Sequence, residues 1–166
     1  LLDECIKVGL GTDISGGHAP SLLDAIRGAL TASRTICIMQ EYQCADSDSV
    51  PEHVASARSQ LSIVEVIYLA TVGGAEAMGL HDKIGNLLEP GYEFDALLID
   101  TTVPDGPVDF FDFDHASDGQ SVAADADFDE AVYLQKLDKF LMCGDDRNIA
   151  NVWVRGRSVA GVAHAV

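Results

Sequence analysis

Residues 8–27 read VGLGTDISGGHAPSLLDAIR, and they predict a short strand, a glycine-rich turn and a capped helix in succession. Val8 and Leu10 alternate with small residues, and the predicted strand ends at a carboxylate, Asp13. In a barrel of parallel strands, catalytic side chains stand at the carboxyl ends of the strands. The stretch therefore places Asp13 where chemistry is expected. The alternative is an aspartate that only caps a turn.

Length and charge limit the class of protein. The chain has 166 residues and a formal net charge of −17. That length suffices for one domain with a core, whereas a complete eight-stranded barrel takes about 250 residues. Because the sequence begins at Leu1 without an initiator methionine, we expect a piece of a longer polypeptide; the alternative is a small α+β domain. The negative field repels polyanions, which argues against nucleic acid or an anionic membrane as a partner.

The first residues and the cysteines favour a cytoplasmic protein. Asp3 and Glu4 stand where a signal peptide carries positive charge, and no apolar run approaches the ~20 residues of a membrane span. The cysteines form no C-x-x-C pair, and we expect them to be reduced and mostly buried. They are Cys5, Cys37, Cys44 and Cys143.

A capping box of Ser21 and Asp24 predicts a helix that ends near Met39–Tyr42. One face of this helix is apolar at helical spacing, through Leu22, Ile26, Leu30 and Cys37.

A second capping box, of Ser62 and Glu65, predicts an apolar helix over 63–72. Gly73-Gly74 is expected to break or bend that helix, and a short helix over 75–78 follows.

The pattern changes after residue 80. Residues 84–100 predict two strands around the Pro90-Gly91 turn, and the apolar run 96–99 is typical of a buried strand. Residues 148–154 and 158–162 predict a closing hairpin.

Residues 105–130 contain eight aspartates, one glutamate and no lysine or arginine. This composition predicts a solvated loop. The alternative is a cation site, since Asp125, Asp127 and Asp129 imitate the start of an EF-hand loop. The position that must be glycine in such a loop holds glutamate here, so the match fails. An amphipathic helix is expected at about 128–143.

Three segments carry a resemblance to one protein family. They are GLGTDISGG with SLLDAIR (9–27), the stretch 80–100, and GDDRNI with VWVRG (144–156). Along nearly its whole length the chain resembles the guanine deaminases of the metal-dependent amidohydrolase superfamily. The resemblance implies an α/β fold, with the C-terminal part of a metal-dependent (β/α)8 TIM barrel over residues 1–80. Residues 81–166 would then supply strands of a small β-sandwich, the acidic loop and the helix at about 128–143.

The same resemblance implies site residues. Asp13 matches the carboxylate that binds the catalytic zinc and accepts a hydrogen bond or proton from the attacking water. Ser15, Gly16 and His18 would face the substrate. For Gly16 the alternative is a plain turn, and for His18 a loop histidine without a catalytic role.

The remaining members of the family's site are expected upstream of this chain. The family's other zinc ligands include an H-x-H pair, and its proton-shuttling glutamate comes from the middle of the barrel. No H-x-H pair occurs among the five histidines here, which are His18, His53, His81, His115 and His164. The chain alone is therefore expected to be inactive.

The activity that the resemblance implies is the zinc-dependent hydrolysis of guanine to xanthine and ammonia, in purine salvage or degradation. One alternative is a deaminase or chlorohydrolase acting on another heterocycle, such as a triazine, cytosine or adenosine. A second is a non-catalytic acidic interaction domain. The expected partners are a purine base, the upstream segment (attached or cleaved) and a second copy in a homodimer. The helix over 21–39 is a candidate for the dimer interface; the alternative is that its apolar face packs within the chain.

Overall fold

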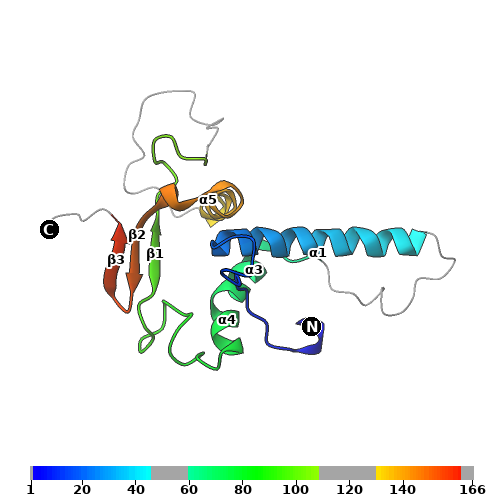
Figure 1. The fold of residues 1–166 in the computed structure, drawn as a ribbon, viewed down its shortest axis with the longest axis horizontal. Coiled ribbons are helices and arrows are strands. Elements are labelled where there is room, and N and C mark those ends of the chain that lie inside the picture. Colours follow the sequence, from blue (N-terminus) through cyan, green and yellow to red (C-terminus); the bar gives the residue numbers. More distant parts are fainter. Residues whose placement is uncertain (1, 46–59, 109–129, 162–166) are drawn as a thin grey trace. The chain divides into compact units, whose positions relative to one another are not determined.

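The computed structural model describes residues 2–45, 60–108 and 130–161 (Figure 1). The helices and strands are α1 (Leu22–Ala45), α3 (Ile63–Ala70), α4 (Val72–Ala77), β1 (Ala96–Ile99), α5 (Glu130–Cys143), β2 (Ile149–Val154) and β3 (Arg157–Gly161). Short 3-10 helices occur at Leu2–Glu4 and Asp146–Asn148. No helix of these three ranges is long and apolar enough to cross a lipid bilayer.

The chain divides into two compact units. The first unit comprises Leu1–Ala96 with Trp153–Val159, and the second comprises Leu97–Val152 with Ala160–Val166. Each unit has its own buried apolar side chains.

The helix α1 confirms the predicted helix and extends it to Ala45, beyond the expected end. At its start the Ser21 hydroxyl oxygen accepts a hydrogen bond from the Leu23 N–H at 3.2 Å. The Asp24 carboxylate pairs with Arg27 at 3.4 Å. The predicted apolar face is partly confirmed, since Ile26 and Leu30 are buried.

The second capping box is confirmed at α3. The Ser62 hydroxyl oxygen accepts from the Glu65 N–H at 3.2 Å, and the Glu65 carboxylate accepts from the Ser62 N–H at 2.8 Å. Val66 and Leu69 on α3 are buried, as are Ile26 and Leu30 on α1, the helix against which α3 packs. These four residues belong to the core of the first unit. Burying each side chain of this size contributes about 2 kcal/mol to the stability of the fold.

The predicted helix break at Gly73-Gly74 was wrong, because the break lies at Thr71. Thr71 leaves the helical region with φ −124° and ψ −93°, and its hydroxyl donates to the Ile67 carbonyl at 2.8 Å. Gly73 and Gly74 lie inside the next helix, α4. The small size of Gly73 allows a close backbone approach from another segment, which is described below.

Two predicted strands were wrong. Residues 6–13 form no strand, although the Leu10 N–H donates to the Leu69 carbonyl at 3.0 Å. Residues 84–89 form bends and no strand, and within 84–100 only residues 96–99 form a strand, β1. A strand needs a hydrogen-bonding neighbour, and within the described ranges only β1, β2 and β3 pair with one another.

The three strands form one small antiparallel sheet in the order β1-β2-β3 (Figure 1). The closing hairpin is confirmed. Its two-residue turn, Arg155-Gly156, has φ values of 52° and 74°, the two positive values of a type I′ turn. The expectation of a buried β1 was wrong, since Leu97 and Leu98 are 55% and 48% exposed. A strand buried on both faces needs a layer on each side, and these side chains lack that cover.

In the second unit, α5 confirms the expected helix from Glu130 onward, and residues 128–129 lie outside the described ranges. So do the acidic stretch 109–129 and its EF-hand-like aspartates. Val108, Phe140 and Leu141 are buried here. Gly144 ends the helix, and its N–H donates to the Phe140 carbonyl at 2.7 Å.

The hydrogen bonds from Thr102 to the Asp100 carboxylate, in the turn after β1, should be detectable in the acid titration of Asp100. The pKa of Asp100 lies below its ordinary value of 3.8, because the hydroxyl and N–H of Thr102 donate to its carboxylate at 2.7 and 2.8 Å. When folding lowers the pKa of a carboxyl group, its ionised form stabilises the folded state at pH values above the pKa of the unfolded chain. This stabilisation is lost as the pH falls through the pKa of the folded state. We expect Thr102→Val, which removes the hydroxyl, to raise the pKa of Asp100 in an NMR titration. An unchanged titration midpoint would contradict this assignment.

Candidate functional site

Asp13 lies in a tight exposed loop that precedes α1. Its φ is +48°, in the left-handed region, and Ser15 follows with φ +77°. The Asp13 carbonyl accepts hydrogen bonds from the Gly16 N–H, at 2.8 Å, and from the Gly17 N–H. Aspartate tolerates this conformation better than most residues, yet two such positions in three residues mark a strained loop.

Space in this loop requires glycine at position 17, while Gly16 lies against the Asp13 side chain. A Cβ on Gly16 would lie 2.6 Å from Oδ2 of Asp13, and a Cβ on Gly17 would collide with the Thr12 carbonyl oxygen. The loop backbone is thus folded closely around the Asp13 side chain. Such glycines are typical of sites where backbone approaches a ligand or a functional group.

The Asp13 carboxylate makes no hydrogen bond or ion pair with any residue of the described ranges, and its side chain is exposed. Ser15, Gly16 and His18 are exposed on the same loop. Within 2–45, 60–108 and 130–161, no three His, Cys, Asp or Glu side chains gather closely enough to hold a metal ion. Because zinc takes three or four protein ligands, the loop can supply one ligand and no complete site.

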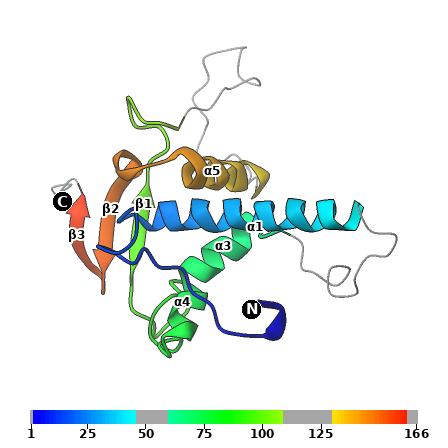
Figure 2. The same ribbon diagram turned by 45° about the vertical axis from the view of Figure 1, so that its right-hand side comes forward.

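The segment that precedes the Asp13 loop contacts two glycines, Gly73 and Gly74, whose role could not be inferred from the sequence. The extended segment 8–10 runs past the junction of α3 and α4 (Figure 2), where it meets Gly73 and Gly74. The glycine pair was interpreted as a helix break, although its position inside α4 follows from this contact. The pair of adjacent glycines, followed by the helix formers Ala75 and Glu76, was the available signal in the sequence.

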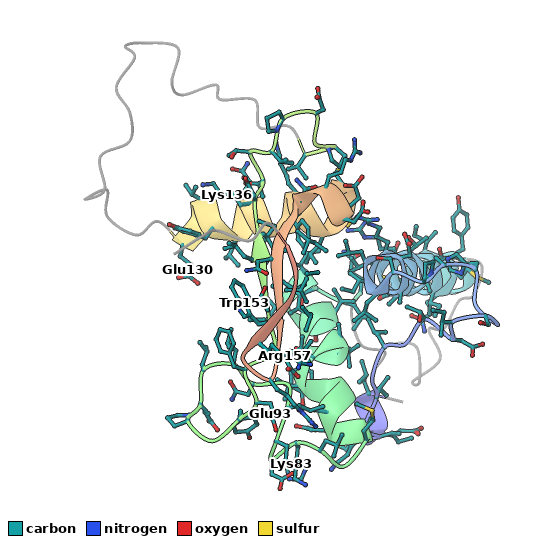
Figure 3. All side chains as sticks on the ribbon, turned by 60° about the vertical axis from the view of Figure 1, so that its left-hand side comes forward. Lys83, Glu93, Glu130, Lys136, Trp153 and Arg157 are labelled. Carbon is teal, nitrogen blue, oxygen red and sulfur yellow. The ribbon has the colours of Figure 1, made fainter. Side chains whose placement is uncertain are left out.

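A pocket of about 760 Å³ lies elsewhere in the first unit, near the turn of the β2–β3 hairpin (Figure 3). Its lining consists of Leu80, Lys83, Ile84, Glu93, Asp95, Val154, Arg155 and Arg157. The Arg155 guanidinium lies 3.8 Å from the Glu93 carboxylate, and the Arg155 N–H donates to Asp95 at 2.8 Å. Through these two contacts Arg155 links the hairpin to the segment before β1. Asp13 does not line the pocket.

The GDDRNI run has a structural role. The Arg147 guanidinium donates to both oxygens of Asp145, at 3.1 and 2.7 Å, and to the Asp105 carbonyl at 2.9 Å. The carboxylate of Asp145 raises the pKa of Arg147, so the pair stays charged. In the first unit, Trp153 packs edge-on against Phe94, with ring centroids 6.1 Å apart.

Comparison with known proteins identifies relatives along the whole chain. The model of the amidohydrolase family matches residues 1–159. Guanine deaminase of Mus musculus is 40% identical over 166 residues, which cover 100% of this chain and 30% of the mouse protein. The chain thus spans less than a third of the length of the curated relatives that it matches.

Solved structures agree with this similarity. The structure of the E. coli guanine deaminase superposes with a TM-score of 0.63 at 29% identity, covering 96% of this chain and 29% of that chain. The structure of the guanine deaminase from C. acetobutylicum, which has guanine bound in its active site, superposes with a TM-score of 0.59 at 28% identity. It covers 96% of this chain and 28% of that one.

Proposed function

The chain belongs to the amidohydrolase family, and from this premise we propose that it forms part of a zinc-dependent guanine deaminase. The reaction is the hydrolysis of guanine to xanthine and ammonia. The observation that carries the proposal is similarity to guanine deaminases over the whole chain. The Asp13 carboxylate, which has no partner among the described residues, supports it.

Asp13 suits the role of a zinc-side carboxylate. Its carboxylate is exposed and free of partners in the described ranges, so it is available as a ligand or as a proton acceptor. Zinc, when bound, lowers the pKa of a water molecule to about 7. Asp13 orients the attacking water through a hydrogen bond and takes its proton, as a general base does. The tight loop around Gly16 fixes the carboxylate for this task.

The loop after Asp13 supports the substrate side of the proposal. Ser15 offers a hydroxyl that makes no hydrogen bond within the described ranges, and this group can donate to a ring nitrogen or oxygen of the purine. Gly16 leaves room for the base to approach the backbone. His18 follows at the mouth of the loop, where its imidazole can contact the same ligand.

The proposal includes the context of the chain. Residues 1–80 belong to the end of a (β/α)8 barrel, and residues 81–166 belong to a small β-sandwich. The upstream part of the polypeptide provides the other zinc ligands and the proton-shuttling glutamate. The complete protein is cytoplasmic and forms a homodimer. The extended segment before Asp13, which lacks a strand neighbour in the described ranges, supports this view, because a barrel strand forms only between two others.

Guanine turnover by the full-length protein that contains this chain tests the proposal. We expect the ultraviolet absorbance of guanine to fall, the activity to disappear after treatment with a chelator, and zinc to restore it. Zinc-bound protein that leaves guanine intact would reject the guanine assignment. A panel of other heterocycles would then identify the substrate.

A further inference from the structure

The segment before Asp13 touches α4 so closely that only glycine fits. A Cβ on Gly9 would lie 2.7 Å from the Cα of Gly74, and a Cβ on Gly73 would lie 2.9 Å from the Val8 carbonyl oxygen. Two carbon atoms in favourable contact are about 3.5 Å apart, so a methyl group on Gly9 would push the backbones apart by roughly 0.8 Å. The hydrogen bond from the Leu10 N–H to the Leu69 carbonyl, at 3.0 Å, fixes the segment lengthwise.

The surface that receives this segment is rigid. Gly73 is buried, Ala75 beside Gly74 is buried, and Leu69 belongs to the core of the first unit. A displacement at Gly9 is therefore taken up by the segment and not by α4. Asp13 lies only a few residues further along, in a loop closed tightly by its own carbonyl, so the carboxylate moves with the segment.

We propose that Gly9 and Gly73 form a glycine seat that sets the position of the Asp13 carboxylate. Gly9 and Gly73 are then positioning residues for the reaction, and this inference rests on the proposed function. Neither residue touches the substrate. Both act by holding the backbone at the distance from which Asp13 reaches the attacking water.

Three alanine variants of the full-length protein test the seat. In Gly9→Ala and Gly73→Ala the added methyl group overlaps backbone across the contact, and kcat is expected to fall about 10²-fold, as for a misplacement near 1 Å. Gly74→Ala is the matched control, because its methyl group would lie 3.5 Å from the Leu69 carbonyl oxygen, an ordinary contact. We expect Gly74→Ala to keep the kcat of the wild type.

Two further measurements separate positioning from a loss of folded protein. The fraction of folded protein, measured by thermal unfolding on the same samples, should stay near that of the wild type in Gly9→Ala and Gly73→Ala while kcat falls. A simple loss of folded protein would lower the folded fraction and the activity in the same proportion. The zinc retained during dialysis against a dilute chelator should also fall in the same two variants.

Specific results overturn the inference. Normal kcat and normal zinc retention in folded Gly9→Ala or Gly73→Ala would reject the seat, as would an equal loss in Gly74→Ala. If Gly9→Ala does not fold, Gly73→Ala decides the question by the same measurements. A wild-type protein that retains zinc without converting guanine would reject the proposed function, and zinc retention by the variants would then judge the seat alone.

Discussion

Asp13→Asn in the full-length protein is expected to lower kcat for guanine about 10³-fold or more. Asparagine keeps the shape of aspartate and tolerates a φ of +48°, so the loop stays folded. It has no negative charge and cannot accept a proton, and general-base catalysis alone contributes about 10² to 10⁴. Steady-state kinetics by ultraviolet absorbance, with thermal unfolding measured on the same sample, gives the result.

The matched control for this experiment is Asp82→Asn. Asp82 is an exposed aspartate of the same unit, so the substitution removes an equal charge from the surface. We expect Asp82→Asn to have the kcat of the wild type. An Asp13→Asn protein that turned over guanine at the rate of Asp82→Asn would exclude Asp13 from the reaction.

Asn148→Ala is expected to lower the free energy of unfolding by about 2 to 4 kcal/mol. The Asn148 side chain is 0% exposed, its amide donates to the Asp100 carbonyl at 3.0 Å, and its oxygen accepts from the Asp145 N–H at 3.2 Å. Alanine would leave both of these backbone groups without their partner. Urea unfolding of the full-length protein, with the midpoint and slope compared with those of the wild type, measures the change.

Asn86→Ala serves as the comparison for this loss. The Asn86 side-chain oxygen accepts one hydrogen bond, from the Leu88 N–H at 3.1 Å, and its side chain is only half-buried. Its replacement should cost about 1 kcal/mol or less. Equal losses in the two variants would show that Asn148 has no special role in joining the turn after β1 to β2.

The elements that the sequence predicted correctly are those specified by adjacent residues. The capping box of Ser62 and Glu65 determines the start of α3 within one turn of helix. Arg155-Gly156 determines a hairpin, since a two-residue turn with positive φ leaves one register for β2 and β3. Such signals need no information about distant parts of the chain.

The errors concern contacts between segments far apart in the sequence. Val8 and Leu10 show the alternating apolar pattern of a strand. A strand also needs a hydrogen-bonded neighbouring strand, and the pattern does not show whether one is present. Gly73-Gly74 has the composition of a helix break, but its cause is the backbone of Gly9, some sixty residues earlier. At the site, Asp13 could be proposed from its motif. Two features of the site appear only in three dimensions: the loop closes on the Asp13 carbonyl, and the Asp13 carboxylate has no partner within residues 2–45, 60–108 and 130–161.

The closing hairpin also bears on the order in which the sheet assembles. β2 and β3 meet by closing a loop of two residues, an event of about 1 to 10 µs, whereas β1 reaches β2 only by closing the long stretch 100–148. The entropy of closure grows with loop length, and the like charges of 105–130 oppose compaction of that stretch further. Assembly from the carboxyl end is therefore favoured: the hairpin forms first and offers the free edge of β2 as the template that captures β1.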